Sequence, residues 1–129
     1  MITFTERRKH IRVSFTQPQM PVCDILNVQD CNANIIHCAI CDISMGGVRL
    51  SLDEAEGIAI GDNLILINVK KTARQEDFLI SGDARLEVDW LSRSKGQSPT
   101  SLGCRIIDIS ENVHNTFANF VLQKLRCGH

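Results

Sequence analysis

The stretch Ile35 to Ser51, IIHCAICDISMGGVRLS, decides the fold of this chain. Residues 35–43 are rich in β-branched apolar side chains and predict a strand, and residues 48–51 resume a short strand pattern. The intervening Ser44-Met45-Gly46-Gly47 is a turn signal, because serine and glycine favour tight turns. The stretch therefore predicts two strands joined by a short turn.

Further strands are predicted on both sides of this pair. Residues 10–16 alternate, which places Ile11, Val13 and Phe15 on one face and Arg12 on the other. Other apolar runs predict strands over residues 22–28, 64–69, 78–91 (where Gly82 marks a bulge or a bend) and 102–109. Six or seven short strands are typical of an antiparallel β-barrel, whose closure leaves no exposed edge.

The hydrophobic period changes to that of a helix after the last strand. Ser110 is placed as the helix N-cap, and apolar residues then recur at helical spacing at Val113, Phe117, Phe120, Val121 and Leu125. A length of 129 residues fits one domain. We expect a mainly β fold in one domain, residues 1–129, with a flexible basic arm (1–12), a six- to seven-stranded antiparallel barrel (13–109) and a C-terminal α-helix (110–127).

Composition limits the partners that this chain can bind. The chain has 14 basic and 15 acidic residues, which argues against binding a nucleic-acid polymer through a broadly positive surface. The first six residues lack the apolar region of a signal peptide, and no apolar stretch reaches the roughly 20 residues of a membrane helix. We therefore expect a cytoplasmic protein, without membrane insertion, whose six cysteines are free thiols.

Two groups of polar residues have the chemistry to bind a guanine-containing anion. Arg8 and Arg12 carry planar guanidinium groups, which pair with phosphate oxygens or with the O6/N7 edge of guanine and also stack on purines. Asp42 and Ser44 share one face of their strand, opposite Ile43. An aspartate only accepts hydrogen bonds, so it complements the N1–H and amine donors of guanine.

The glycines of the turn extend this predicted pocket. Gly46 and Gly47 allow positive φ and a close approach of the ligand, so their N–H groups are expected to face an anion. Each motif also has a simpler explanation, since the arginines alone indicate a solvated basic arm and the aspartate motif alone indicates an Asx or Ser turn. Their occurrence together, in this order around predicted strands, favours the ligand pocket.

The sequence resembles a PilZ domain, the bacterial receptor module for cyclic di-GMP. PilZ domains carry R-x-x-x-R before the first strand and D/N-x-S-x-x-G in a later strand and turn, matched here by Arg8, Arg12, Asp42, Ser44 and Gly47. Residues 102–106 and the following helix also resemble the ending of the family. The resemblance implies a six-stranded barrel with a helix, and an arm that folds over the ligand against the outer face of the barrel.

The resemblance also implies how such a protein acts. Arg7 occupies the position where an arginine favours an intercalated dimer of cyclic di-GMP, so two ligand molecules are expected. The arm would change conformation and signal to an unidentified downstream protein in motility, biofilm or virulence control, from a monomer or weak homodimer. The alternative is a PilZ-like scaffold that binds proteins but no nucleotide.

The remaining reactive residues do not predict an enzyme or a metal site. Cys38 and Cys41 have the spacing of a zinc or redox pair, but residues three apart in a strand face opposite ways. A site built from Cys23, Cys31, Cys127 and His129 stays open, with buried thiols the default. His10 and His37 have no nucleophile or suitably spaced carboxylate near them in the sequence. Trp90 is expected to pack in the core or at its rim, with stacking on the ligand as the alternative.

Overall fold

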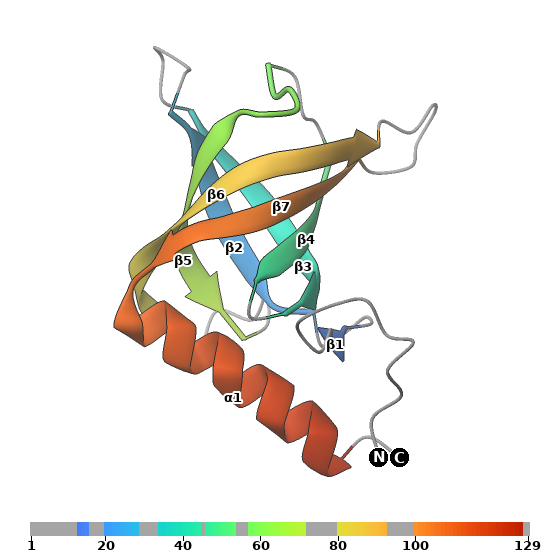
Figure 1. The fold of residues 1–129 in the computed structure, drawn as a ribbon, viewed down its shortest axis with the longest axis vertical. Coiled ribbons are helices and arrows are strands. Elements are labelled where there is room, and N and C mark those ends of the chain that lie inside the picture. The colour runs from blue at the N-terminus through green and yellow to red at the C-terminus, as the bar shows by residue number, and fades with distance from the viewer. Residues whose placement is uncertain are drawn as a thin grey trace.

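Seven strands and one helix follow one another along the described part of the chain (Figure 1). The computed structural model describes residues 13–15, 20–28, 34–44, 46–53, 57–71, 80–92 and 100–127. The expected arm, with Arg7, Arg8 and Arg12, lies outside the described residues. The elements are β1 (Val13–Ser14), β2 (Val22–Asn27), β3 (Ile35–Ile43), β4 (Gly47–Leu52), β5 (Asn63–Lys70), β6 (Ile80–Ser92), β7 (Thr100–Ile109) and α1 (Glu111–Cys127).

Six of these strands close into an antiparallel barrel, as the sequence predicted. The hydrogen-bonded order is β1-β3-β2-β5-β6-β7-β4, and an additional pairing of β3 with β4 closes the ring. The short β1 lies outside the ring and pairs with the end of β3, where Val13 is opposite Ile43. The β3–β4 hairpin thus closes the barrel, because β3 and β4 are the strands at the two ends of the hydrogen-bonded order. The turn that connects them is the one predicted over residues 44–47.

The core fills the barrel and continues to the C-terminal helix. Apolar side chains of every barrel strand point inward, and α1 lies across one end of the barrel, where Figure 1 shows it below β5 and β6. Val113 and Phe117 on α1 are fully buried, and the Phe120 ring meets the Phe15 ring edge to face at 5.6 Å. The helical spacing read from the sequence therefore identified the buried face of α1.

The start of α1 is fixed by β6 as well as by its own cap residue. The helix begins at Glu111, and the carbonyl of Ser110 accepts a hydrogen bond from His114 N–H at 2.9 Å. The Ser110 hydroxyl accepts a hydrogen bond from Asp83 N–H at 3.1 Å, and Ser110 N–H donates to the Asp83 carbonyl. The N-cap prediction has the right position, and the hydroxyl ties the helix to β6.

The strand register shifts at several points of the barrel, and two of these shifts, in β3 and β6, change which side chains face outward. In β3, Ile40 pairs with Leu50 and Asp42 pairs with the adjacent Arg49. Cys41 is therefore an extra residue in β3, with no counterpart in β4. This β-bulge shifts the alternation by one residue. In β6, two residues, 81 and 82, stand opposite Asn68 of β5, which confirms the predicted bulge at Gly82.

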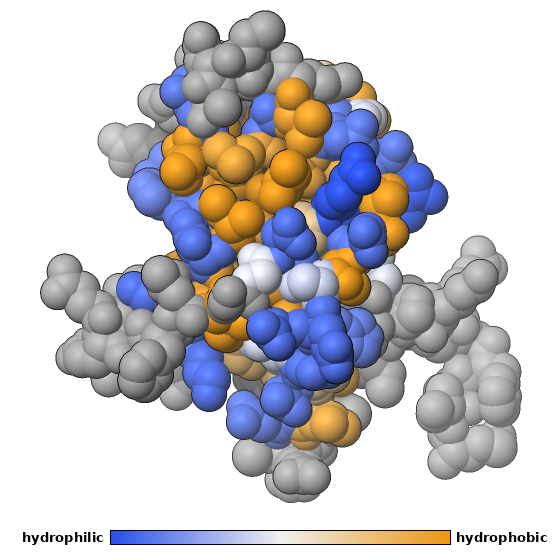
Figure 2. Space-filling view, turned by 90° about the vertical axis from the view of Figure 1, so that its left-hand side faces the viewer, coloured by the Kyte–Doolittle hydropathy of each residue, from blue (hydrophilic) through white to orange (hydrophobic). Residues whose placement is uncertain are grey.

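The outer surface of the barrel is not uniformly polar. Figure 2 shows apolar side chains gathered over the upper part of one face, above a region of hydrophilic ones. Across three neighbouring strands, Ile35, Leu26 and Ile65 are direct cross-strand partners on the outside, and Ile35 is 53% exposed. This face of the barrel therefore carries an apolar region beside a polar one.

Gly82 is the position where a side chain should be least tolerated. Its φ of 133° is one that L-residues rarely adopt, and a Cβ would overlap the Ser110 hydroxyl that anchors α1. We expect Gly82→Ala to lower the unfolding free energy by about 2 kcal/mol or more in urea denaturation. Gly61→Ala is the matched control, because Gly61 has φ 92° but open space around it, so only backbone strain applies. Equal losses in both variants would contradict the steric role.

Candidate ligand-binding site

Four outward-facing residues form one continuous row across the barrel. Asp42 of β3 pairs with Arg49 of β4, Arg49 pairs with Gly103 of β7, and Gly103 pairs with Trp90 of β6. Their chain neighbours Ile43, Val48, Leu50, Leu102 and Cys104 are in the core, so strand alternation turns the row outward. We call these four residues the outer row.

The carboxylate of Asp42 is the most enclosed polar group of the outer row. The residue is 4% exposed, because β1 passes on one side, with Ser14 opposite, and Arg49 lies on the other. Arg49 Nε donates to Asp42 Oδ2 at 2.7 Å, and the arginine side chain is itself 39% exposed. A guanidinium beside a buried carboxylate offsets the loss of hydration of that charge.

Ser44 holds the β3–β4 turn together. Its hydroxyl oxygen accepts hydrogen bonds from Gly46 N–H at 3.4 Å and Gly47 N–H at 3.1 Å. Its own N–H donates to the Gly47 carbonyl at 2.9 Å. The expectation that these N–H groups face an anion is therefore not met in this structure, because they are directed at the serine, as in the simpler turn explanation.

Position 47 needs a glycine because two strands approach closely there, and not because its backbone angle is unusual. Its φ is outside the left-handed range that a glycine permits, and a Cβ would lie 2.9 Å from the Cys104 carbonyl of β7. Beside it, Gly46 accepts a hydrogen bond from Ile106 N–H at 3.0 Å. Arg105, the cross-strand partner of Gly47, is paired with Glu87 of β6. The turn is thus packed directly on β7.

Trp90 covers the far end of the outer row. A Cβ at Gly103 would overlap the indole ring, so the ring packs directly against the bare backbone of this glycine. Trp90 is 40% exposed and belongs neither to the core nor to the side chains packed against it, so the expected packing in the core or at its rim is not found, and part of the ring is in contact with solvent. It is the only tryptophan of the chain.

The structure therefore brings together part of the predicted site and adds residues to it. Asp42, Ser44, Gly46 and Gly47 lie on and beside the outer row, while the three arginines of the arm lie outside the described residues. Sequence reasoning missed the contribution of Arg49, whose place opposite Asp42 depends on the bulge at Cys41. It also missed Gly103 and Arg105, which only the closed barrel brings beside the turn.

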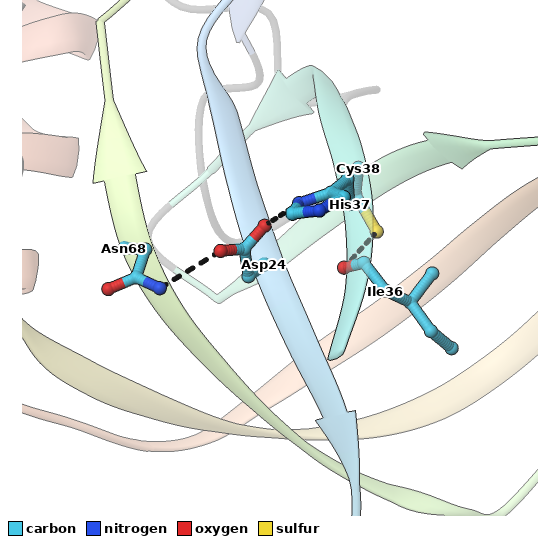
Figure 3. Close-up of polar contacts among 5 residues, drawn as sticks. All are labelled: Asp24, Ile36, His37, Cys38 and Asn68. Atoms are coloured by element: carbon cyan, nitrogen blue, oxygen red, sulfur yellow. Dashed lines mark hydrogen bonds and ion pairs between the residues drawn. The ribbon is translucent and has the colours of Figure 1, made fainter. Parts of the chain in front are cut away.

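A second polar cluster lies on the outside of β2, β3 and β5 (Figure 3). His37 Nδ1 is 2.5 Å from Asp24 Oδ1, and Asn68 donates to the other oxygen of Asp24 at 2.9 Å. The carboxylate that the sequence did not show near His37 is thus supplied across the strands. The adjacent thiol does not face it, since Cys38 Sγ donates to the Ile36 carbonyl at 3.7 Å. These contacts satisfy one another and form no nucleophile–base pair.

The described cysteines are buried free thiols, as expected. Cys23 and Cys38 are opposite one another on β2 and β3, and the hydrogen bond between their thiols, with burial, raises the pKa of Cys23 well above 9.0. Burial raises the pKa of Cys104 to about 12. Cys38 packs in the main core cluster, whereas Cys41 is buried outside that cluster, so the pair points to different sides of β3. Such protonated thiols are poor nucleophiles and poor metal ligands.

Searches for a metal site and for a membrane span give no candidate in the described ranges. Within them no group of three or more His, Cys, Asp or Glu is placed to hold a metal ion. Cys31, the side chain of Cys127 and His129 lie outside the described residues. None of the described helical residues forms a helix long and apolar enough to cross a bilayer.

The closed barrel with an outside strand, a C-terminal helix and a glycine turn beside an outward aspartate defines a class of small β-barrel binding domains. The family model that describes the PilZ domain matches residues 6–123. The chain therefore belongs to the PilZ domain family, as the motifs predicted. A comparison with curated proteins finds no match.

Solved structures share this fold at low sequence identity. The inhibitor of motility MotI/DgrA of Bacillus subtilis superposes with a TM-score of 0.68 at 14% identity, over 96% of this chain and 54% of that chain. The PilZ domain of YcgR from Escherichia coli, solved with c-di-GMP, gives 0.63 at 17% identity, over 94% and 93%. The K. pneumonia MrkH–c-di-GMP complex gives 0.61 at 15% identity, over 93% and 53%. The chain thus spans about half the length of MotI/DgrA and MrkH.

The buried thiol of Cys104 should make stability depend on alkaline pH. Its folded pKa of about 12 exceeds the ordinary 9.0, so between these values the folded state keeps a proton that the unfolded state loses. We expect this stabilisation to be complete below pH 9 and to be lost as pH rises toward 12. Urea denaturation at about pH 8 and about pH 10 measures the fall, and Cys104→Ala should reduce it.

The control for this measurement is Val88→Ala. Val88 is the cross-strand partner of Cys104 and is equally buried, so its truncation should lower stability without changing the pH dependence. The same alkaline slope in the wild type and in Cys104→Ala would contradict the assignment. Tyrosine cannot contribute to the slope, because the chain has none.

Proposed function

We propose that this protein is a cyclic di-GMP receptor of the bacterial cytoplasm, a binding module and not an enzyme. The observation that carries the proposal is the outer row beside the glycine turn, where a buried, arginine-paired aspartate faces outward in a member of the PilZ family. The c-di-GMP complexes of the YcgR PilZ domain and of MrkH, which share the fold, support the choice of ligand.

The chemistry divides between the barrel and the N-terminal arginines. Asp42 accepts hydrogen bonds from the guanine N1–H and amine, which are the donors that an arginine cannot serve. Arg8 and Arg12 pair with phosphates and with the O6/N7 edge, and guanidinium planes stack on the bases. The exposed part of the Trp90 ring, at the far end of the same row, offers a second stacking surface for a purine.

In this proposal, ligand binding changes the conformation of the arm, and that change is the signal. The barrel wall is held by its hydrogen-bonded turn and closed sheet, so the proposal assigns the conformational change to the N-terminal arm and not to the wall. An unidentified downstream protein would read the new conformation, in motility, biofilm or virulence control. The neighbour named as an inhibitor of motility and the transcription regulatory factor MrkH support this range of outputs for the fold.

The proposal predicts tight binding that depends on the first arginine of the motif. Calorimetric titration with cyclic di-GMP should show binding by the wild type, and Arg8→Ala should weaken it about tenfold or more, because a charge-assisted bidentate contact is lost. Quenching of Trp90 fluorescence should follow the same isotherm, since this is the only tryptophan. Arg85→Ala is the control: Arg85 is exposed on β6, opposite Ile65 and Asp108, away from the outer row.

Failure of the wild type to bind cyclic di-GMP would contradict the receptor and favour a scaffold that binds only proteins. One observation supports that alternative. The N–H groups of Gly46 and Gly47 already donate to the Ser44 hydroxyl, so the turn is hydrogen-bonded without a ligand.

The stoichiometry is a separate prediction that rests on Arg7. We expect two equivalents of cyclic di-GMP per chain, bound as an intercalated dimer in which stacked guanines alternate with guanidinium planes. Arg7→Ala should reduce the calorimetric stoichiometry to one. A single equivalent bound by the wild type would rule out the dimer while leaving the receptor intact.

A further inference from the structure

Two arginines and two glycines alternate on the outer surface where β4 and β7 pair. Arg49 of β4 is opposite Gly103 of β7, and Gly47 of β4 is opposite Arg105 of β7. The register between these two pairs is regular and the residues of the pair between them lie in the core, so all four residues face outward. The arginines therefore stand at diagonal corners of a square whose other two corners carry no side chain.

The two glycine corners of this square differ in what lies over them. The bare backbone at Gly103 is covered by the Trp90 indole ring. A Cβ at Gly47 would meet the Cys104 carbonyl and, at 3.9 Å, the Ser44 hydroxyl. Apart from its chain neighbours, no other atom of the described residues comes within 4 Å of that Cβ. The corner at Gly47 is therefore open to the outside, with a floor of backbone, beside the turn of the family motif.

The two arginine corners differ in how firmly their side chains are held. Arg49 Nε donates to the carboxylate of Asp42, a residue that is only 4% exposed. The Arg105 side chain is 58% exposed, and its partner Glu87 is 33% exposed. An ion pair in contact with water contributes little to stability. Arg105 can therefore exchange the Glu87 carboxylate for another anion at little cost to the fold.

The chemistry of the open corner suits a phosphate. A guanidinium group donates two parallel hydrogen bonds, which match two oxygens of a carboxylate or of a phosphate. A glycine beside the arginine lets such an anion approach the backbone closely. Arg105 is fixed next to this glycine by the regular register with β4, and the following N–H, of Ile106, donates to the Gly46 carbonyl at 3.0 Å.

We propose that Arg105 is a further ligand-binding residue, which leaves Glu87 and donates to a phosphate of cyclic di-GMP over the open corner at Gly47. Glu87 is then an internal competitor, whose carboxylate lowers the affinity of the site for the phosphate. The inference rests on the proposed function. It adds one phosphate contact from the barrel wall to those of the N-terminal arginines.

Calorimetric titration with cyclic di-GMP tests both roles. Arg105→Gln should weaken binding about threefold to tenfold, because one charge-assisted contact is lost, and Arg105→Lys should give an intermediate value. Glu87→Gln should strengthen binding about threefold, because the competing charge of an exposed pair is removed. The control is Arg85→Gln, which makes the same change of charge at an exposed position whose cross-strand partners are Ile65 and Asp108.

Two further measurements separate a ligand contact from a structural role. Urea denaturation of Arg105→Gln should give the wild-type midpoint, because the pair with Glu87 is exposed. The ³¹P resonance of bound cyclic di-GMP should move in Arg105→Gln and stay in place in Arg85→Gln, since only the first variant removes a donor from a phosphate. If Arg105→Gln does not fold, Arg105→Lys carries the same comparison.

Three results would overturn the inference. Wild-type affinity and an unmoved ³¹P resonance in Arg105→Gln would show that the arginine does not contact the phosphate. Equal losses of affinity in Arg105→Gln and Arg85→Gln would show an effect of overall charge alone. Weaker binding by Glu87→Gln would show that Glu87 holds Arg105 in place for the ligand and does not compete. In each case the wild type still binds cyclic di-GMP, whereas a wild type that does not bind overturns the proposed function as well.

Discussion

The single extra residue of β3, Cys41, is the constraint on which the site depends. Upstream of it Cys38 and Ile40 face the core, and downstream Ile43 does, although Ile40 and Ile43 are three residues apart. Regular alternation cannot place both inside, so the strand needs a bulge between them. The core thereby dictates that Asp42 faces outward opposite Arg49. The pairing of Asp42 with Arg49 on the outside of the barrel is thus a consequence of where Ile40 and Ile43 must be buried.

The rest of the barrel makes this hairpin rigid. The turn is closed by the Ser44 hydroxyl and is packed against β7 so tightly that Gly47 has no room for a side chain. At the other end, the bulge at Gly82 brings the backbone of β6 close to Ser110, which connects the sheet to α1. A site wall built on closed strands positions side chains more accurately than a free loop can.

The sequence predicted much of this architecture because alternation and helical spacing are local signals. The strands and the buried face of α1 could be read from periodicity, and the turn over residues 44–47 from its serine and glycines. The bulge at Cys41 was not, since a pattern of inward residues at 38, 40 and 43 is visible only once the inward direction of each strand is known. Arg49 and Gly103 were missed because barrel closure, and not sequence proximity, places them beside Asp42 and Trp90.

Charge on the described surface explains why a ligand pocket here would need the N-terminal arginines. Along the outer row and beside it, the two guanidinium groups are already matched, Arg49 with Asp42 and Arg105 with Glu87. A wall whose charges are paired offers shape and hydrogen-bond direction but little net attraction for a doubly charged nucleotide. The four basic residues among positions 7–12 have a different character, since they supply strong attraction to phosphates and their arginines can also pair with the O6/N7 edge of guanine. Most of the attraction for the phosphates would therefore come from the arm, while the arm and the wall would read different edges of the same guanine, so neither segment alone would make a receptor.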